Sequence, residues 1–439
     1  MSLPPERFGQ LAPDPSWAFA QLSAQQTGYL THCYHRYPAK FIPQLAARLI
    51  REHSRPAQVV LDPFMGSGTT VVEALVHGRL ARGLDINPAA VIATRAKTRA
   101  IPPERLRPAL ADFAEQLARL EDRGRAPSLF PLPEPLLPAD RERLDWWFPR
   151  PQQRRLGIIL ALIEAREDRA LRDFLRCAFS HCLKTSSYWL MKSSKPTRDK
   201  AKLGRGVPHP VPILRRHLAK MERANAAFWK HLPQEVRRRP AAEVRRGDAR
   251  ELPWPAESVD LVVTSPPYVT SYEYADLHEL TALWLGGRAD LAARKDQFIG
   301  SAAARGRDDA EPQSPLAHRT AEALRPRSES KADEVRQYFL DMERAFAEIR
   351  RVLKPRAFIC NVIGNTALEG VEIRNAEVHA ELLEAQGFEL AGVVRRVIPL
   401  KTLPQVRDPK TGRFTSATTN AVEAYPEEFI LFARKKARP

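Results

Sequence analysis

The run Thr264-Ser265-Pro266-Pro267-Tyr268 holds residue types that could carry chemistry on an amine. Two consecutive prolines have a fixed φ and no backbone donor, so the neighbouring carbonyl groups are held in one direction. An aromatic amine becomes nucleophilic when acceptors take its N–H bonds and draw the nitrogen toward tetrahedral geometry, which preorganised polar groups do well. The Ser265 hydroxyl and the Pro266 carbonyl are such acceptors, and Tyr268 offers a flat face for a base flipped out of a duplex. The alternative is a proline-rich turn with a buried tyrosine.

A second candidate site lies earlier in the chain, in the run from Asp62 to Thr69. Gly66 and Gly68 follow a predicted strand and precede a predicted helix, where a tight turn lets backbone N–H groups approach a ligand. Asp85 ends the next predicted strand about twenty residues on, where a carboxylate can accept hydrogen bonds from ribose hydroxyls. The loop lacks the lysine of a triphosphate-binding loop and the third glycine of a dinucleotide-binding loop. Its spacing favours a nucleoside ligand, with a purely structural turn as the alternative.

The whole run Asp62-Pro63-Phe64-Met65-Gly66-Ser67-Gly68-Thr69-Thr70 resembles the motif with which bacterial DNA amino-methyltransferases bind S-adenosylmethionine. The resemblance implies that the two glycines pass the methionyl part, that Asp85 holds the ribose, and that Asp248 lies near the adenine amino group. The segment from Tyr37 to Pro43 resembles a further cofactor motif of this family. A surface turn at Asp248 and a proline-capped helix start at Tyr37 to Pro43 are the alternatives. The implied cofactor residues are Tyr37, Pro38, Lys40, Phe41, Asp62, Pro63, Phe64, Gly66, Ser67, Gly68, Thr69, Asp85, Asn87 and Asp248.

The form of the proline motif bears on which base would be modified. In this family an Asp-Pro-Pro-Tyr motif is frequent in adenine-N6 enzymes and a Thr-Ser-Pro-Pro-Tyr motif is typical of cytosine-N4 enzymes, and this chain has the second form. The resemblance therefore implies a site-specific DNA methyltransferase acting on cytosine N4. The implied catalytic residues are Ser265, Pro266, Pro267 and Tyr268. The physical argument alone leaves adenine N6 open, because serine and aspartate can each accept a hydrogen bond from either amine.

The composition narrows the class of protein. The chain has 439 residues, 44% of them hydrophobic, with 69 lysines and arginines against 52 acids and a net charge of +17. Such an excess of positive charge favours association with nucleic acid. The four cysteines lack the close pairs of a zinc site, so no metal is expected, and none follows a proline as the nucleophile of cytosine-C5 methylation usually does. No signal peptide or apolar run of roughly 20 residues is visible, which predicts a cytoplasmic protein without a membrane span.

Alternating strand and helix patterns must position these motifs. Val59 to Leu61 reads as a short buried strand ending at Asp62, Thr69 to Val76 as a helix, and the next strand ends at Asp85, which is the start of a parallel sheet. The resemblance implies an α/β, Rossmann-like class I methyltransferase fold, with a mainly parallel seven-stranded sheet flanked by helices and a last antiparallel strand. The other expected elements are strands at Glu243–Arg246, Asp260–Thr264, Phe358–Val362, Val393–Val397 and Glu428–Phe432, and an amphipathic helix from Phe339 to Leu353.

The same patterns divide the chain into segments. An arginine-rich stretch broken by prolines reads as an inserted helical subdomain, which is the preferred candidate for target recognition. The stretch from Ala289 to Lys331 has little apolar periodicity and reads as a loop or a disordered insertion, the rival candidate. The expected segments are an N-terminal extension (1–29), the cofactor half of the core (30–100), the helical insertion (101–242), the catalytic part of the core (243–288), a flexible loop (289–335) and the C-terminal strands (336–439).

DNA is the expected partner, and a role in restriction and modification would add a cognate restriction endonuclease. The run from Lys184 to Arg205 combines lysines and arginines with aromatic residues, which suits phosphate contact and base stacking. A solvated charged face is the alternative. The runs Arg237 to Arg239 and Lys401 to Arg413 are further basic candidates. Two other functions stay open, an RNA amino-methyltransferase and an inactive DNA-binding protein on the same fold. The predicted DNA-binding residues are Lys184, Tyr188, Trp189, Lys192, Lys195 and Arg198.

Overall fold

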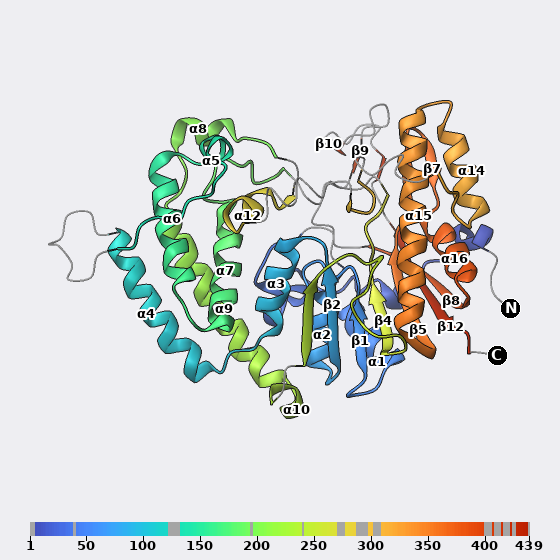
Figure 1. Cartoon of the computed structure of the whole chain (residues 1–439), viewed down its shortest axis with the longest axis horizontal. Coiled ribbons are helices and arrows are strands. Elements are labelled where there is room, and N and C mark those ends of the chain that lie inside the picture. Colours follow the sequence, from blue (N-terminus) through green and yellow to red (C-terminus); the bar gives the residue numbers. More distant parts are fainter. Residues whose placement is uncertain are drawn as a thin grey trace.

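A seven-stranded sheet with the strand order β3-β2-β1-β4-β5-β12-β8 forms the centre of the molecule (Figure 1). The first five of these strands pair in parallel, and β12 is antiparallel to both of its neighbours. The predicted α/β class I fold with one antiparallel strand is confirmed. The strands are β1 (Val59–Asp62), β2 (Leu80–Asp85), β3 (Ala242–Arg246), β4 (Val259–Thr264), β5 (Leu353–Ile363), β8 (Phe388–Val397) and β12 (Glu427–Lys435).

The computed structural model describes most, though not all, of the chain. Segments that follow the Thr264–Tyr268 motif, at 270–276, 287–296 and 302–308, lie outside it, as does most of the basic run from Lys401 to Arg413. No helix among the residues it does describe is long and apolar enough to cross a membrane. The described residues are 5–37, 41–121, 132–193, 196–238, 241–269, 277–286, 297–301, 309–398, 406–407, 414–415, 422–423 and 427–437.

Helices cover both faces of the sheet because neighbouring strand residues point to opposite sides. Leu61 and Val262 face one apolar core, which includes side chains of α14, α15 and α16. Val60 and Val263 face another core with α1 and α2. The flanking helices are α1 (Pro43–His53), α2 (Thr69–Val76), α3 (Pro88–Thr98), α14 (Pro315–Leu324), α15 (Glu329–Val352) and α16 (Asn375–Ala385).

The described residues of the stretch predicted to be a helical insertion form mostly helices, which lie to one side of the sheet (Figure 1). They have a third apolar core of their own, built around buried side chains such as Trp147, Phe174 and Leu214, and the later helix α12 (Glu279–Trp284) packs into it. The segment boundaries, including 101–242, stay predictions. The helices are α4 (Pro103–Glu121), α5 (Arg141–Trp147), α6 (Arg150–Glu164), α7 (Arg169–Leu183), α8 (Lys200–Arg205), α9 (Pro210–His231) and α10 (Gln234–Arg237).

The prediction of a loop at 289–335 is wrong for much of this segment. Helix α14 and the start of α15 lie within it. Ser314 caps α14 by accepting a hydrogen bond from the Ala317 amide at 3.0 Å, and Pro315 occupies the first helical position. Leu316 and Leu324 are buried in the core shared with α15. Parts of the predicted loop, residues 289–296 and 302–308, lie outside the described residues.

Short elements complete the description. One two-stranded pair and one three-stranded sheet lie apart from the main sheet. Short 3-10 helices precede α1. These elements are η1 (Pro5–Gln10), η2 (Pro15–Trp17), η3 (Gln26–Gly28), η4 (Leu30–Cys33), β6 (Thr366–Leu368), β7 (Val371–Ile373), β9 (Val406–Arg407), β10 (Phe414–Thr415) and β11 (Val422–Glu423).

Candidate active site

The two sequence motifs meet where the strand order reverses, between β1 and β4. Open parallel sheets bind ligands in the crevice beyond the carboxyl ends of the strands at this switch point. Asp62 ends β1 and Thr264 ends β4, and the two strands pair directly. The Thr264 hydroxyl donates a hydrogen bond to the Asp62 carboxylate at 2.7 Å. Motifs far apart in sequence are therefore joined at one edge of the sheet.

A pocket of about 700 Å³, partly open to solvent, lies at this edge. Both motifs contribute to its wall, as do residues that follow β2 and β3 and a short segment at 297–299. The lining residues are Tyr37, Pro63, Phe64, Gly66, Asp85, Ile86, Asn87, Gly247, Asp248, Ala249, Ser265, Pro267, Gln297, Phe298 and Ile299.

Half of the predicted catalytic and cofactor residues line this pocket. Pro38 and Lys40 lie outside the described residues. Phe41, Asp62, Ser67, Gly68, Thr69, Pro266 and Tyr268 are not part of the lining. The predicted residues that line the pocket are Tyr37, Pro63, Phe64, Gly66, Asp85, Asn87, Asp248, Ser265 and Pro267.

The glycine loop is held by the acid at the end of the next strand. Asp85 accepts hydrogen bonds from the backbone amides of Gly66 and Asn87, each at 2.8 Å. Desolvation raises the pKa of the Asp85 carboxyl to about 6, against the lowering effect of these bonds. Gly68 caps α2 with φ +78°, and a Cβ there would lie 2.6 Å from a methyl carbon of Thr94. Only glycine fits this turn without strain.

Asp62 lies behind the glycine loop and connects it to the Thr264–Tyr268 motif. Its side chain is 2% exposed and accepts hydrogen bonds from the Phe64 amide at 3.1 Å and from Thr264. Burial raises the pKa of this carboxyl to about 7. Asp62 therefore acts on the position of the loop from outside the pocket wall. Among the described residues, no group of three or more His, Cys, Asp or Glu side chains could hold a metal ion.

The proline turn is fixed from behind by a chain of buried polar side chains. The Tyr338 hydroxyl donates to the Pro267 carbonyl at 2.9 Å and lies 3.1 Å from Nε2 of His379, whose Nδ1 lies 3.0 Å from Asn361 Nδ2. Tyr338 has one proton to donate, so Nε2 of His379 must donate to its oxygen and Nδ1 must accept from Asn361. Burial lowers the pKa of His379 to about 3, which keeps the ring neutral. Sequence reasoning missed this support, because its members lie on three different elements.

Tyr268 is positioned by contacts on two sides. Its Cε2 lies where a side chain at Gly364 would collide, since a Cβ there would be 3.0 Å away. Its hydroxyl is 3.4 Å from a carboxylate oxygen of Glu428, which pairs with the buried Arg396. The ring is partly buried beside the pocket rather than in its wall.

The burial of Trp189 contradicts the prediction that this residue contacts DNA. Its side chain is 2% exposed, stacks on Trp147 with ring centroids 4.9 Å apart, and donates to the Ser193 carbonyl. It therefore cannot stack on a base. Lys184 also donates to Ser193, at 2.8 Å, and burial with neighbouring cations lowers its pKa to about 8.

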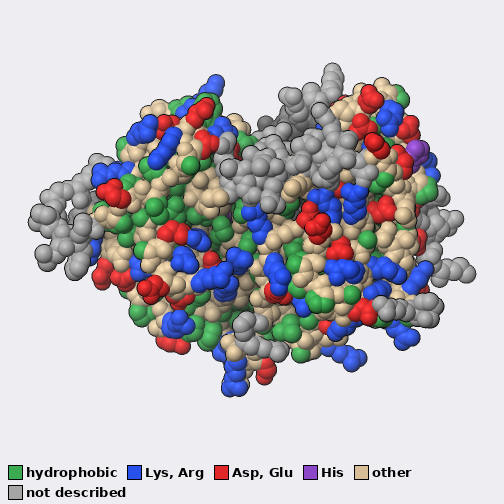
Figure 2. All heavy atoms as spheres, in the orientation of Figure 1, with side chains coloured by type: hydrophobic (Ala, Val, Ile, Leu, Met, Phe, Trp, Pro, Cys, Tyr) green, Lys and Arg blue, Asp and Glu red, His purple; other side chains and the backbone are tan. Residues whose placement is uncertain are grey.

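The neighbouring surface has an exposed aromatic residue that sequence reasoning missed. Trp146 is 48% exposed, and the Arg198 guanidinium lies over both its ring and that of Tyr188, 4.5 Å and 5.0 Å from the centroids. Lys192 is exposed nearby in sequence, and Lys195 lies outside the described residues. On the face shown in Figure 2, lysines and arginines are interspersed with acids, so net charge alone does not locate a DNA-binding surface.

Comparison with known proteins finds DNA methyltransferases among the similar sequences. Residues 10–95 match the model of a DNA methylase family that joins N6 and N4 enzymes. The type II methyltransferase M.MvaI of Kocuria varians is 28% identical over 434 residues, 92% of each chain. The DNA adenine methyltransferase YhdJ of Escherichia coli is 35% identical over 85 residues, 19% of this chain and 27% of that protein.

Among solved structures, the comparison finds a putative DNA modification methylase from Thermus thermophilus in complex with S-adenosylmethionine. It is 20% identical, covers 44% of this chain and 55% of its own, and has a TM-score of 0.22. The fold assignment therefore rests on the strand order. The sheet, the motifs at its switch point and the sequence matches together support a DNA amino-methyltransferase that uses S-adenosylmethionine.

Proposed function

We propose that this chain transfers a methyl group from S-adenosylmethionine to the N4 amine of a cytosine in duplex DNA. The observation that carries the proposal is that Ser265 of the Thr-Ser-Pro-Pro-Tyr turn lines the same pocket as Gly66 and Asp85. The full-length similarity to a type II methyltransferase favours a role in restriction and modification, with a cognate endonuclease as the second protein of the pair.

The residues of the pocket fit the cofactor. Each Asp85 carboxylate oxygen accepts one backbone hydrogen bond, which leaves lone pairs for the ribose hydroxyls. The Asn87 side chain is 1% exposed, and its Nδ2 has no hydrogen-bond partner among the described residues, so the pocket holds a donor for a ligand. Tyr37 lines the opening and stacks on His278 with centroids 4.5 Å apart. The bound cofactor would supply a methyl group on a positively charged sulfur.

The reaction turn would activate the amine. We assign the Ser265 hydroxyl and the Pro266 carbonyl as acceptors of its two N–H bonds, and Tyr268 as the surface that the flipped base stacks on. The hydrogen bond from Tyr338 to the Pro267 carbonyl keeps the turn in place before the base arrives. Preorganised acceptors of this kind need no rearrangement during the reaction, which is the source of their effect on rate.

Adenine N6 is the second candidate target. The observation that favours it is the match to an adenine methyltransferase, together with the ability of serine to accept a hydrogen bond from either amine.

A competition assay distinguishes a DNA substrate from an RNA substrate. Unlabelled duplex DNA or RNA is added while a labelled methyl group is transferred to DNA. We expect unlabelled DNA, and not RNA, to compete.

Replacement of Ser265 or Tyr268 by alanine tests the assigned roles. We expect both variants to lose methyl transfer to DNA while they still bind S-adenosylmethionine, because neither residue holds the cofactor in this proposal. Ser258→Ala, at the opposite end of β4, is the matched control and should keep its activity, since this serine bonds only to groups remote from the pocket. Retained activity in both Ser265→Ala and Tyr268→Ala would contradict the assignment.

The DNA would contact the helices beside the sheet. We place the aromatic and cationic stack of Trp146, Arg198 and Tyr188, with Lys192, on this contact surface. A guanidinium held between two rings can meet a phosphate, and the exposed face of Trp146 can stack on a base.

A further inference from the structure

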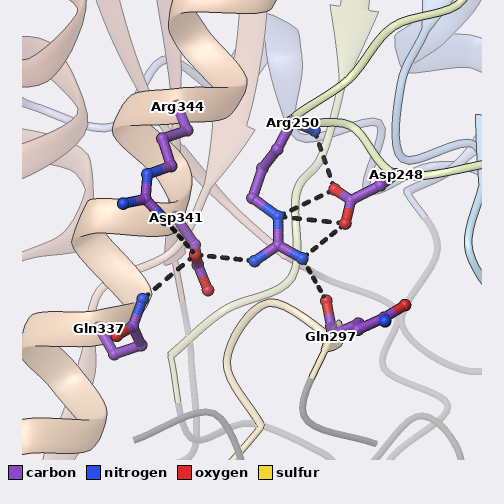
Figure 3. A network of polar contacts seen from close by, with 6 residues as sticks. All are labelled: Asp248, Arg250, Gln297, Gln337, Asp341 and Arg344. Carbon is purple, nitrogen blue, oxygen red and sulfur yellow. Dashed lines mark hydrogen bonds and ion pairs between the residues drawn. The ribbon is translucent and has the colours of Figure 1, made fainter. Parts of the chain in front are cut away.

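Arg250 joins three separate parts of the chain at the edge of the pocket (Figure 3). It follows β3 in sequence, and its guanidinium holds the carboxylate of Asp248, with Nε 3.0 Å from Oδ1 and Nη2 2.5 Å from Oδ2. Its Nη2 also donates to the Gln297 carbonyl at 2.8 Å, and its Nη1 forms an ion pair with Asp341 on α15 at 2.8 Å. The side chain of Arg250 is 11% exposed.

Two of these three partners line the pocket. Asp248 and Gln297 come from segments that do not adjoin in sequence, and Arg250 is the group that bonds to both. The third partner, Asp341, is the anchor. It is fully buried and is also contacted by Gln337, at 3.3 Å, from the preceding turn of the same helix.

The chemistry of the guanidinium explains why an arginine occupies this position. Its planar fork presents five N–H donors in fixed directions. Here Nε and Nη2 donate to the Asp248 carboxylate and the Gln297 carbonyl, while Nη1 forms the ion pair with Asp341. A lysine ammonium is a single point of charge and cannot reproduce this set of directions. Hydrogen bonds between ionised partners are also stronger than neutral ones, so the arrangement is held firmly.

We propose that Arg250 is a positioning residue for the cofactor pocket, which fixes the Asp248 carboxylate and the wall at Gln297 against helix α15. The inference rests on the proposed function, because it takes S-adenosylmethionine as the ligand of the pocket. Without Arg250 the Asp248 carboxylate and the Gln297 segment lose their common anchor, while Ser265 and its turn keep their own contacts with Tyr338. Cofactor binding should therefore weaken more than the catalytic step.

Arg351 provides a matched control. It is also an arginine that ties the chain after β3 to α15, because it donates to the carbonyls of Leu252 and Trp254 at 2.8 and 2.9 Å and pairs with Glu348. None of its partners lines the pocket. A purely structural role for Arg250 predicts equal effects of the two substitutions on cofactor binding, and a positioning role predicts a difference.

The test compares Arg250→Gln, Arg250→Lys and Arg351→Gln with the wild-type chain. Isothermal titration with S-adenosylmethionine gives the dissociation constant, thermal unfolding gives stability, and methyl transfer gives KM and kcat. We expect both Arg250 variants to raise the dissociation constant and the KM for S-adenosylmethionine on the order of 10- to 100-fold, the effect of losing a hydrogen bond to a charged group. Their kcat at saturating cofactor should stay within about threefold of wild type, and the KM for DNA should not change.

The outcomes separate this inference from the proposed function. Arg351→Gln should lower the unfolding temperature and leave the dissociation constant within about twofold. The inference is overturned if the Arg250 variants bind S-adenosylmethionine like wild type, or if Arg351→Gln weakens binding as much as they do. Arg250→Lys, which keeps the positive charge, extends the comparison should Arg250→Gln fail to fold. A wild-type chain that binds the cofactor but methylates no DNA would overturn the proposed function alone.

Discussion

Replacement of Asp62 by asparagine should make the stability of the protein less dependent on pH. The Asp62 side chain is 2% exposed, and burial raises its pKa from 3.8 to about 7. Between these values the unfolded chain has released the proton and the native state still holds it, so stability falls as pH rises. The contribution is fully present below about pH 4 and is lost as pH passes through 7.

The size of this effect follows from the shift. About three pH units at about 1.36 kcal/mol each give a loss of about 4 kcal/mol between pH 4 and pH 7. Asparagine keeps a side-chain oxygen for the hydrogen bonds from Thr264 and Phe64 but has no proton to release. Asp85 titrates in the wild type and in the variant, so its contribution largely cancels in the comparison.

Urea unfolding of wild type and Asp62→Asn at half-unit steps from pH 4 to pH 8 measures the difference. We expect the wild type to lose about 4 kcal/mol more than the variant over the window from pH 4 to 7, with the curves parallel above it. Parallel curves over the whole range would refute the reasoning, because they would mean that Asp62 is already ionised in the native state at pH 4.

Four further substitutions test the support of the turn, the DNA surface and the core beside it. Tyr338→Phe removes the hydrogen bond to the Pro267 carbonyl, and we expect a loss of about 1–3 kcal/mol in stability by urea unfolding and a lower kcat, with unchanged cofactor affinity. Gly364→Ala places a Cβ 3.0 Å from the Tyr268 ring, so kcat should fall in steady-state assays without a change in the KM for S-adenosylmethionine. Trp146→Ala should weaken DNA binding in a filter assay and leave the unfolding temperature unchanged, whereas Trp189→Ala should destabilise the chain by about 3–5 kcal/mol.

Much of the sheet and the core of the site could be predicted because their signals are local. A short apolar run that ends in an acid, followed by glycines and then a helix, specifies a strand, a turn and a helix within a few residues. Asp62, Gly66 and Asp85 therefore stand where the pattern placed them. The contact between Asp62 and Thr264 was not predicted, although both residues end parallel strands, whose carboxyl ends lie at one edge of the sheet.

Features that depend on packing could not be read from the sequence. Trp146 and Trp147 are adjacent in sequence, but only the second is buried, and it is the one that stacks on Trp189. A basic run with aromatic residues has the same composition whether its rings face solvent or a core. Two of the three partners of Arg250 lie on α15 and on the 297–301 segment, and no local pattern indicates which distant group an arginine contacts.

The sequence of helix α14 contains a weak signal for a helix, which the prediction of a loop overlooked. Ser314 followed by Pro315 is a helix start, and the buried positions Leu316, Thr320 and Leu324 recur every four residues. Three alanines and the polar residues His318, Arg319 and Glu322 between them hide this periodicity in a hydrophobicity pattern, which is why the stretch resembles a loop.

Mass spectrometry of methylated DNA tests the account most directly. The chain is expressed in a host that lacks DNA methylation, and the genomic DNA is digested to nucleosides, with Ser265→Ala as the matched control. We predict N4-methylcytosine with the wild-type chain and none with the variant. N6-methyladenine without N4-methylcytosine would contradict the proposed base, and no modified nucleoside at all from a folded, cofactor-binding chain would contradict the proposed reaction.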